Sequence, residues 1–444
     1  MDKTDGGFDA ATFAQQFNQF SPEYGPHYKD IYRHMRAHCP VAHTDEVGGF
    51  WVVTRYADIV RVALDAEAFA SRYGVFMSRV NPDPPKAGSG PPGEARTGPL
   101  AAYKPGPNGE APRLSFLPLE LDPPLHGLYR KALEPLFSPQ AVTELAPWLL
   151  ALTDQLIDAI IENGKGDFCR DLSTKLAGIW TMKLLGLPLE DWSDYAWFIQ
   201  MANGGSSSVQ PRTKNPSERE LRERVVAEMV RQRTQPIAGG VIAHLLDATI
   251  AGRKLDGWEI EAYLWLLIGN PDATQACMAS SFVWLSRNPE QRRRLAETPH
   301  LLPHAIEEFL RVFSPVHAFS RTVMHDAVLA GQSLKRGDRV LLSWVSGNAD
   351  ETAFENPEAV DFDRANKRHM AFGVGPHRCL GADVVRLEFR IMFERIRSRM
   401  PDFRVEEAAL RPSPAPATVA GYEHVNFVFT PGKKLGGPRI AYDG

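Results

Sequence analysis

A short segment around Cys379 limits what this chain can fold into more than any other part of the sequence. Residues 371–381 read Ala-Phe-Gly-Val-Gly-Pro-His-Arg-Cys-Leu-Gly. Glycine and proline exclude regular structure before the cysteine, and apolar residues at helical spacing follow it to about Met400. Cys379 is therefore predicted to lie in a tight loop at the N-terminus of a helix. Unpaired N–H groups and the helix dipole favour a thiolate at such a position.

The surroundings of Cys379 limit what it can bind. Flanking glycines would let a flat, bulky group approach the backbone closely. The other cysteines, Cys39, Cys169 and Cys277, are scattered along the chain, which disfavours a zinc site, an iron–sulfur cluster and a disulfide framework. A single thiolate in a glycine-lined loop suits the axial position of a haem iron.

Helical periodicity dominates the rest of the chain, so the predicted fold class is α+β, mostly α. Short strands are predicted at 50–54 and within 320–345, and residues 346–370 are irregular and rich in turns. Helices are expected over residues 58–69, 126–136, 142–163, 172–187, 218–233, 258–287, 290–296 and 303–313.

Two segments interrupt what we treat as a single domain over residues 1–444. Residues 80–113 hold nine prolines and six glycines, so neither a helix nor a sheet can run through them. They are predicted to form a long surface loop, either a mobile insertion without function or a lid over a pocket. Residues 203–217 are predicted to be a flexible connector between helices.

Composition excludes several classes of protein. The chain has 444 residues, of which 43% are hydrophobic and 23% charged, and its net charge is −4. This balance is typical of a globular protein and gives no reason to expect nucleic acid as the main partner. The longest apolar stretch, about 262–268, is far shorter than a bilayer requires, and the N-terminus is polar and acidic. We expect a monomeric cytoplasmic protein that does not enter a membrane.

The Cys379 segment resembles the haem-binding signature of the cytochrome P450 family, at positions Phe372, Gly373, Gly375, His377, Cys379 and Gly381. The resemblance implies haem b as the cofactor. It also implies the P450 fold, in which a long central helix crosses the haem and small β-sheets lie at the edge.

A second family motif, ExxR, is similar to Glu308-Phe309-Leu310-Arg311. Glu308 and Arg311 share one helix face, where they can lock the turn-rich region that follows, residues 348–364. The resemblance implies that both residues are structural and not catalytic.

Haem carries two carboxylates, and their burial requires cations and hydrogen-bond donors. The family supplies these from positions that correspond here to His126, Arg130, Arg321, His369 and His377. Together with Cys379, the resemblance assigns cofactor binding to these residues and to Phe372, Gly373 and Gly381.

The central helix carries the oxygen chemistry in this family, with an acid followed by a threonine. Here the acid is Asp272, but Ala273 stands where the threonine is usual, and Thr274 follows one position later. Thr274 could replace the missing group, a water or the substrate's own hydroxyl could relay protons, or the protein could use peroxide and need no relay. These alternatives stay open.

The resemblance implies a monooxygenase that inserts one atom of O2 into a moderately hydrophobic organic substrate, a reaction typical of secondary metabolism. The alternatives are a peroxide-using haem-thiolate peroxygenase or isomerase and a non-enzymatic haem sensor. By family position, the substrate pocket is expected to include Phe116, Leu117, Leu266, Gly269, Ala273, His317, Phe319, Val425 and Phe427.

Electrons are expected from a separate ferredoxin or flavodoxin-type protein and its reductase. A local excess of positive charge after Cys379 would suit an acidic carrier. The arginines that produce this excess are Arg378, Arg386, Arg390, Arg395, Arg397 and Arg399.

Overall fold

Helices dominate the part of the chain that the structure describes, which confirms the predicted α+β, mostly α class. The structure, a computed structural model, describes residues 8–77, 116–204, 206–413, 417 and 419–442. The predicted 80–113 loop lies outside the described residues. The α-helices of the described ranges are α1 (Ala10–Gln15), α2 (Tyr24–His38), α3 (Tyr56–Leu64), α4 (Leu125–Leu133), α5 (Pro139–Asp158), α6 (Thr174–Leu185), α7 (Trp192–Gly204), α8 (Glu218–Gln232), α9 (Val241–Asp247), α10 (Gly257–Gly269), α11 (Pro271–Arg287), α12 (Pro289–Glu297), α13 (Leu302–Val312), α14 (Trp344–Gly347) and α15 (Ala382–Arg399).

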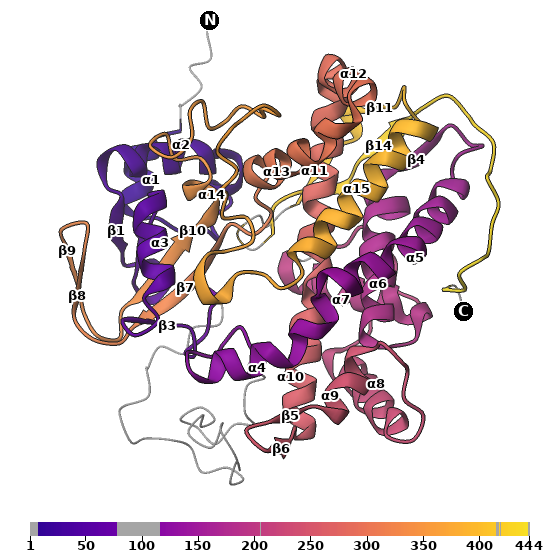
Figure 1. Ribbon diagram of the computed structural model, residues 1–444. Coiled ribbons are helices and arrows are strands. Elements are labelled where there is room, and N and C mark those ends of the chain that lie inside the picture. Colours follow the sequence, from indigo (N-terminus) through magenta and orange to yellow (C-terminus); the bar gives the residue numbers. More distant parts are fainter. Residues whose placement is uncertain (1–7, 78–115, 205, 414–416, 418, 443–444) are drawn as a thin grey trace, which may run out of the picture.

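The largest described sheet lies beside the helical part of the molecule, to the left in Figure 1. Its central strand β10 reads Arg-Val-Leu-Leu-Ser and is buried on both faces. Val340 and Leu342 face one apolar cluster with α3, and Leu341 faces another with α1 and α2. The spatial order of the strands is β1 (Val41–Thr44), β2 (Phe50–Val53), β10 (Arg339–Ser343), β7 (Ala318–Val323) and β3 (Phe69–Ala70).

The remaining strands form smaller sheets at the edges. A sheet of β11 (Arg404–Val405), β14 (Asn426–Val428) and β4 (Lys165–Asp167) flanks the helices. The described two-stranded sheets are β5 (Thr249–Ile250) with β6 (Arg253–Lys254), β8 (Ala327–Leu329) with β9 (Gln332–Leu334), and β12 (Arg411–Pro412) with β13 (Tyr422–His424).

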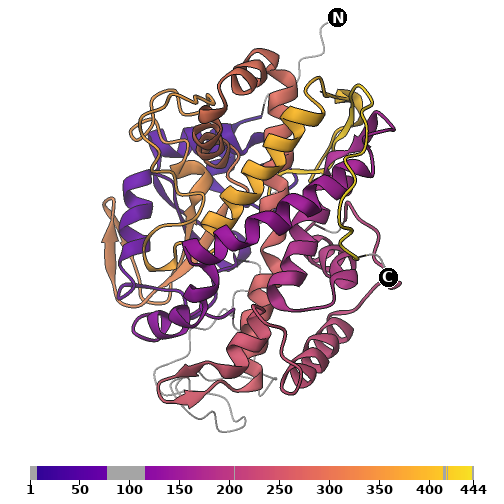
Figure 2. The same ribbon diagram turned by 45° about the vertical axis from the view of Figure 1, so that its right-hand side comes forward.

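The predicted central helix at 258–287 is two helices, α10 and α11. Pro271 has no N–H to donate, and Asn270 closes the last turn of α10 by donating its N–H to the Leu267 carbonyl at 3.3 Å. Asn270 keeps helical dihedral angles, so the two rods follow each other through the helical part of the molecule, with α15 running nearby (Figure 2).

Two other predictions need correction. The helix predicted over 58–69 ends at Leu64, because the Asp65 carboxylate accepts the N–H of Ala68 in a turn and Phe69 enters strand β3. The predicted connector 203–217 begins inside α7. One part of it is tied to that helix, since Thr213 donates its N–H to Asp194 at 2.7 Å.

No helix in the described ranges combines the length and the apolar character needed to cross a bilayer.

Candidate functional site

Cys379 lies in a loop whose shape depends on glycine. Gly373 and Gly375 have φ angles of 70° and 75°, which disfavour other residues, and a Cβ at Gly375 would lie 2.9 Å from the Ala63 carbonyl oxygen. The loop closes when Cys379 donates its N–H to the Phe372 carbonyl at 2.8 Å. Gly381 then caps α15, so the predicted placement of the cysteine before a helix is confirmed.

Burial has the largest effect on the pKa of the Cys379 thiol. It raises the pKa of the thiol, and the Gly381 N–H and the charges of Arg130 and Arg378 act in the opposite direction. Burial therefore favours the protonated thiol, against the preference for a thiolate at a helix N-terminus. A metal ion that binds the sulfur displaces this proton, and the cysteine then serves as a ligand.

Beside Cys379 is a cavity of about 250 Å³ between the sheet and the helices. It is lined by predicted site residues from distant parts of the chain, namely His126, Arg130, Leu266, Ala273, Thr274, Phe319, Arg321, Phe372, Gly373, His377, Cys379 and Gly381.

One wall of this cavity carries two arginines and two histidines, and the buried arginine, Arg321, makes no ion pair among the described residues. Arg321 is 3% exposed, and its described side-chain hydrogen bond goes to the Ser320 carbonyl at 2.8 Å. Arg130 lies 3.9 Å from Glu134, and the rings of His126 and His377 are 4.2 Å apart. Burial, reinforced by the neighbouring arginines, lowers the pKa of His126 to about 4 and that of His377 to about 2.

This donor set fits haem. Uncompensated buried cations are unfavourable unless a ligand supplies negative charge, and haem brings two carboxylates. The Nδ1 atom of His377 is buried without a partner among the described residues, so it is available to such a ligand. A single thiol and a glycine-lined wall complete the site.

His369, the remaining predicted haem contact, does not line the cavity. Its Nε2 lies 3.1 Å from a carboxylate oxygen of Glu307, which also pairs with Arg386 at 2.7 Å. Despite burial, the hydrogen bonds from Arg386 and His369 lower the pKa of Glu307 to about 2. Glu307 of α13 thus joins the loop that contains His369 to Arg386 of α15, and no local motif indicates this partner of His369.

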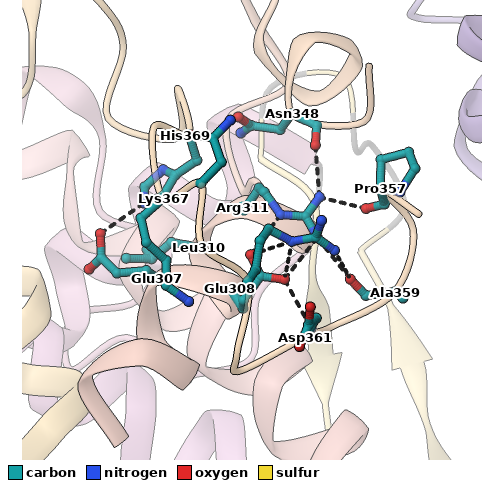
Figure 3. Close-up of polar contacts among 12 residues, drawn as sticks. Glu307, Glu308, Leu310, Arg311, Asn348, Pro357, Ala359, Asp361, Lys367 and His369 are labelled. Atoms are coloured by element: carbon teal, nitrogen blue, oxygen red, sulfur yellow. Dashed lines mark hydrogen bonds and ion pairs between the residues drawn. The ribbon is translucent and has the colours of Figure 1, made fainter. Parts of the chain in front are cut away.

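Glu308 and Arg311 form a closed, buried network (Figure 3). Both side chains are 1% exposed, and the Arg311 Nε donates to Glu308 at 2.9 Å. A second guanidinium, that of Arg364, donates to Glu308 at 3.0 Å. Arg311 also donates to the carbonyls of Asn348, Pro357 and Ala359. The pair is thereby joined to the turn-rich region.

Asp272 faces away from the central cavity, although Pro271, Ala273 and Thr274 line it. Its carboxylate accepts hydrogen bonds from Asn203 and Gln275, both at 3.1 Å, and from Gln200 at 3.4 Å. Burial raises the pKa of Asp272. The acid therefore lies behind the cavity wall, held by α7, while Thr274 is the neighbouring hydroxyl within the wall.

Several residues predicted for the substrate pocket do not line this cavity. Val425 and Phe427 pack in the core with Phe282, whose ring centroid is 5.0 Å from that of Phe427. His317 is buried against Tyr24, with its Nδ1 2.7 Å from the tyrosine hydroxyl oxygen. The predicted residues Phe116, Leu117 and Gly269 are displaced by their neighbours, since Pro118, Leu119 and Asn270 line the cavity instead.

Sequence reasoning missed a wall made by α6, which contributes Ala177, Trp180, Thr181 and Leu184. The signal was present, because α6 is buried around most of its circumference, which is typical of a helix packed on several sides. It also missed Glu388 of α15. Burial raises the pKa of this carboxyl to about 8, and its Oε1 atom has no partner among the described residues.

Three of the six arginines predicted to attract an acidic carrier are already paired with acids. Arg386 meets Glu307 and Asp383, Arg395 meets Asp154, and Arg399 meets Asp154 and Asp158. The acids Asp154, Asp158 and Glu307 lie in α5 and α13. A count of the charged residues that follow Cys379 in the sequence therefore did not include them. Within the described part of the chain, Arg378 and Arg390 are exposed without an acidic partner.

Comparisons with known proteins agree with this geometry. The sequence model of the family "Cytochrome P450" matches residues 225–414. A crystal structure of CYP109E1 from Bacillus megaterium in complex with testosterone is 26% identical, covers 92% of this chain and 99% of its own, and has a TM-score of 0.73. Polyketide biosynthesis cytochrome P450 PksS from Bacillus subtilis is 30% identical over 65% of this chain and 72% of its own length.

The steroid C26-monooxygenase of Mycolicibacterium smegmatis is 30% identical over 411 residues, which are 91% of this chain and 93% of that protein. This match extends over nearly the whole length of both chains. The chain belongs to the cytochrome P450 family and is a haem-thiolate monooxygenase.

Proposed function

We propose that haem b binds in the central cavity, with Cys379 as its thiolate ligand. The observation that carries this proposal is that one thiol, the buried Arg321, Arg130 and two histidines line the same cavity. Arg130, Arg321, His126 and His377 would meet the two carboxylates. When bound, the haem supplies oxygen activation, and its thiolate ligand favours cleavage of the O–O bond.

The proposed reaction inserts one atom of O2 into an organic substrate. It consumes two electrons and two protons, and the second oxygen atom leaves as water. The chain's own residues bind and orient the substrate, exclude bulk water and supply the protons.

We assign proton supply to Asp272 and Thr274. Asp272 is held by the amide groups of Gln200, Asn203 and Gln275, and burial raises the pKa of its carboxyl. Thr274 is 7% exposed and lines the cavity, so its hydroxyl is the group of α11 best placed to pass a proton inward. Ala273 has no such group, which puts Thr274 in the role of the usual threonine.

The substrate proposed is a moderately hydrophobic molecule, and steroids are the class to test first. The cavity walls supply Leu266, Phe319, Trp180 and Leu184, which suit an apolar skeleton. The names of two similar proteins mention steroids, one as a steroid C26-monooxygenase and one as a complex with testosterone.

A ferredoxin or flavodoxin-type protein, itself reduced by a reductase, is proposed as the electron donor. Arg378 and Arg390 offer it exposed positive charge near the cysteine loop. That the protein is monomeric, forms a single domain and is located in the cytoplasm stays a prediction.

The ligand assignment is tested by spectroscopy. Haem-loaded protein, reduced under carbon monoxide, should show the red-shifted absorption band that a thiolate ligand produces, and Cys379→Ala should not. A band that survives in Cys379→Ala, or that is absent from the parent protein, would overturn the assignment.

The reaction is tested by comparing two oxidant supplies. Testosterone and other steroids are first screened for a shift of the haem spin state, and the best compound is then incubated with ferredoxin, reductase and O2, or with hydrogen peroxide alone. A monooxygenase forms hydroxylated product in the first mixture. Product only in the peroxide mixture would indicate a peroxygenase, and no shift with any compound would favour a sensor.

A further inference from the structure

Behind α11, on the side away from Cys379, lies a second and much smaller cavity. Its volume is about 30 Å³, and the polar residues around it are Gln200, Asn203, Ser206, Asp272, Gln275 and Glu423. They come from α7 and the loop after it, from α11 and from β13. Asp272 is thus shared between this polar space and the helix that walls the central cavity.

Three polar atoms around this small cavity are buried and have no hydrogen-bond partner in the described part of the chain. They are the Oε1 of Gln275, the Oε1 of Glu423 and the Oγ of Ser206. Gln275 is only 6% exposed, and its other terminal atom, Nε2, already donates to Asp272. Unpartnered buried polar atoms are rare in folded proteins, and several around one space indicate an ordered water.

A water molecule matches these groups. The space exceeds the roughly 10–15 Å³ that one water requires. A water can donate its two O–H bonds to Gln275 Oε1 and to the Asp272 carboxylate, and it can accept the hydroxyl proton of Ser206 and the carboxyl proton of Glu423, which satisfies all three atoms.

Glu423 and Asp272 differ in position. Both residues are partly exposed, but Asp272 lies on α11 next to the wall of the central cavity, whereas Glu423 lies on β13 of a two-stranded sheet. Both carboxyls line the same small cavity. Burial raises the pKa of each carboxyl, which favours a bound proton on each.

We propose that Glu423 and a water in this cavity form the entry route by which protons from solvent reach Asp272. A proton leaves the Glu423 carboxyl for the water, the water gives another of its protons to the Asp272 carboxylate, and Glu423 regains a proton from bulk solvent. Two such transfers supply the two protons that each oxygen insertion consumes. This inference rests on the proposed role of Asp272 as proton donor.

The first test is structural and needs no turnover. A high-resolution crystal structure of the haem-loaded protein should show a water within hydrogen-bond distance of Gln275 Oε1 and Glu423 Oε1. A cavity that is empty or filled by a side chain would overturn the route.

The second test follows the proton on Asp272 by infrared spectroscopy after rapid mixing of haem-loaded protein with D2O. The carboxyl band of Asp272 is identified by its loss in Asp272→Asn. Glu423→Gln keeps the shape of the side chain but cannot donate a proton, so deuterium should reach Asp272 at least about tenfold more slowly, a factor worth about 1.4 kcal/mol of barrier. Glu423→Asp should restore part of the rate.

Glu406→Gln is the matched control, since Glu406 is an exposed glutamate nearby whose side chain does not line the cavity. Its exchange rate should equal that of the parent protein. Exchange in Glu423→Gln at the parent rate, or a protein without any protonated Asp272 band, would contradict the route.

A third measurement separates this inference from the proposed function. Under reductase-driven turnover, the share of consumed O2 released as hydrogen peroxide should rise in Asp272→Asn and in Glu423→Gln, because late protons let peroxide escape. A rise only in Asp272→Asn would leave the role of Asp272 intact and overturn the Glu423 route. No rise in Asp272→Asn would show that the proposed role of Asp272 itself is wrong.

Discussion

Two groups of arginines in this protein differ in how their positive charge is compensated. In the network of Arg311 and Arg364, both guanidinium groups meet the Glu308 carboxylate and backbone carbonyls. In the central cavity, the buried Arg321 makes no ion pair among the described residues, and Arg130 has Glu134 at 3.9 Å as its acidic partner. A buried charge satisfied by the chain itself maintains the fold, whereas a buried charge left over indicates a ligand.

The largest loss of stability should follow from breaking the network of Glu308, Arg311 and Arg364. Arg311→Leu removes the main partner of Glu308 and leaves the carbonyls of Asn348, Pro357 and Ala359 without their donor. Breaking a buried ion pair in this way costs about 3–5 kcal/mol. Urea unfolding of the haem-loaded protein should show this loss, and a change below about 1 kcal/mol would refute the structural role of the pair.

In the cavity cluster, removal of a cation should have two effects of opposite sign. Arg321→Met takes away a desolvated charge, so the haem-free protein should be at least as stable as the parent. Haem affinity should fall by about 1.5–3 kcal/mol, the value of a hydrogen bond to a charged group. Unfolding of the haem-free protein and the rate of haem transfer to apomyoglobin measure the two effects.

Arg390→Met, on the exposed side of α15, is the control for both measurements and should change neither. If Arg321→Met lowered the stability of the haem-free protein as much as the haem affinity, the cation would be structural and the contrast between the clusters would disappear.

The pH dependence sharpens the contrast further. The pKa of His126 is about 4 in the folded chain and about 6.5 when unfolded, so between these values the unfolded state binds the extra proton. Stability of the haem-free protein is complete above pH 6.5 and falls as the pH drops toward 4, by up to about 1.4 kcal/mol per pH unit from this residue. His126→Gln should remove that part of the slope in urea unfolding curves. An identical slope in the variant would show that His126 is already charged.

The smallest effect is expected at an ion pair outside both clusters. Arg294 and Asp363 are 2.7 Å apart, with side chains 38% and 62% exposed. Arg294→Ala should cost less than about 1 kcal/mol, because solvent and salt screen the pair. Unfolding at low and high salt measures this, and a loss comparable to that of Arg311→Leu would contradict the distinction drawn between buried and exposed charge.

Local sequence patterns were sufficient to predict much of the fold and the cysteine loop at the centre of the site. Strong 3.6-residue periodicity located most helices, and the spacing of Cys379, His377 and the glycines located the cysteine loop before α15. Glu308 and Arg311 were found because their partnership is one turn of a single helix.

Contacts between distant segments could not be predicted in the same way. His317 was expected in the substrate pocket, yet its partner Tyr24 lies 293 positions earlier. Val425 and Phe427 belong to a strand whose inward face is set by packing on Phe282, not by its own sequence. Asp272 turned toward α7 because two amides of that helix happen to meet it there.

The break between α10 and α11 has a mechanical consequence. A regular helix resists bending because every turn is closed by its own hydrogen bonds, but the proline at position 271 has none to lose. The wall formed by Leu266, Asn270 and Ala273 is therefore more compliant at this point than an uninterrupted helix would be. Substrates of different widths can be accommodated by a small change in the angle between α10 and α11, without unfolding either helix.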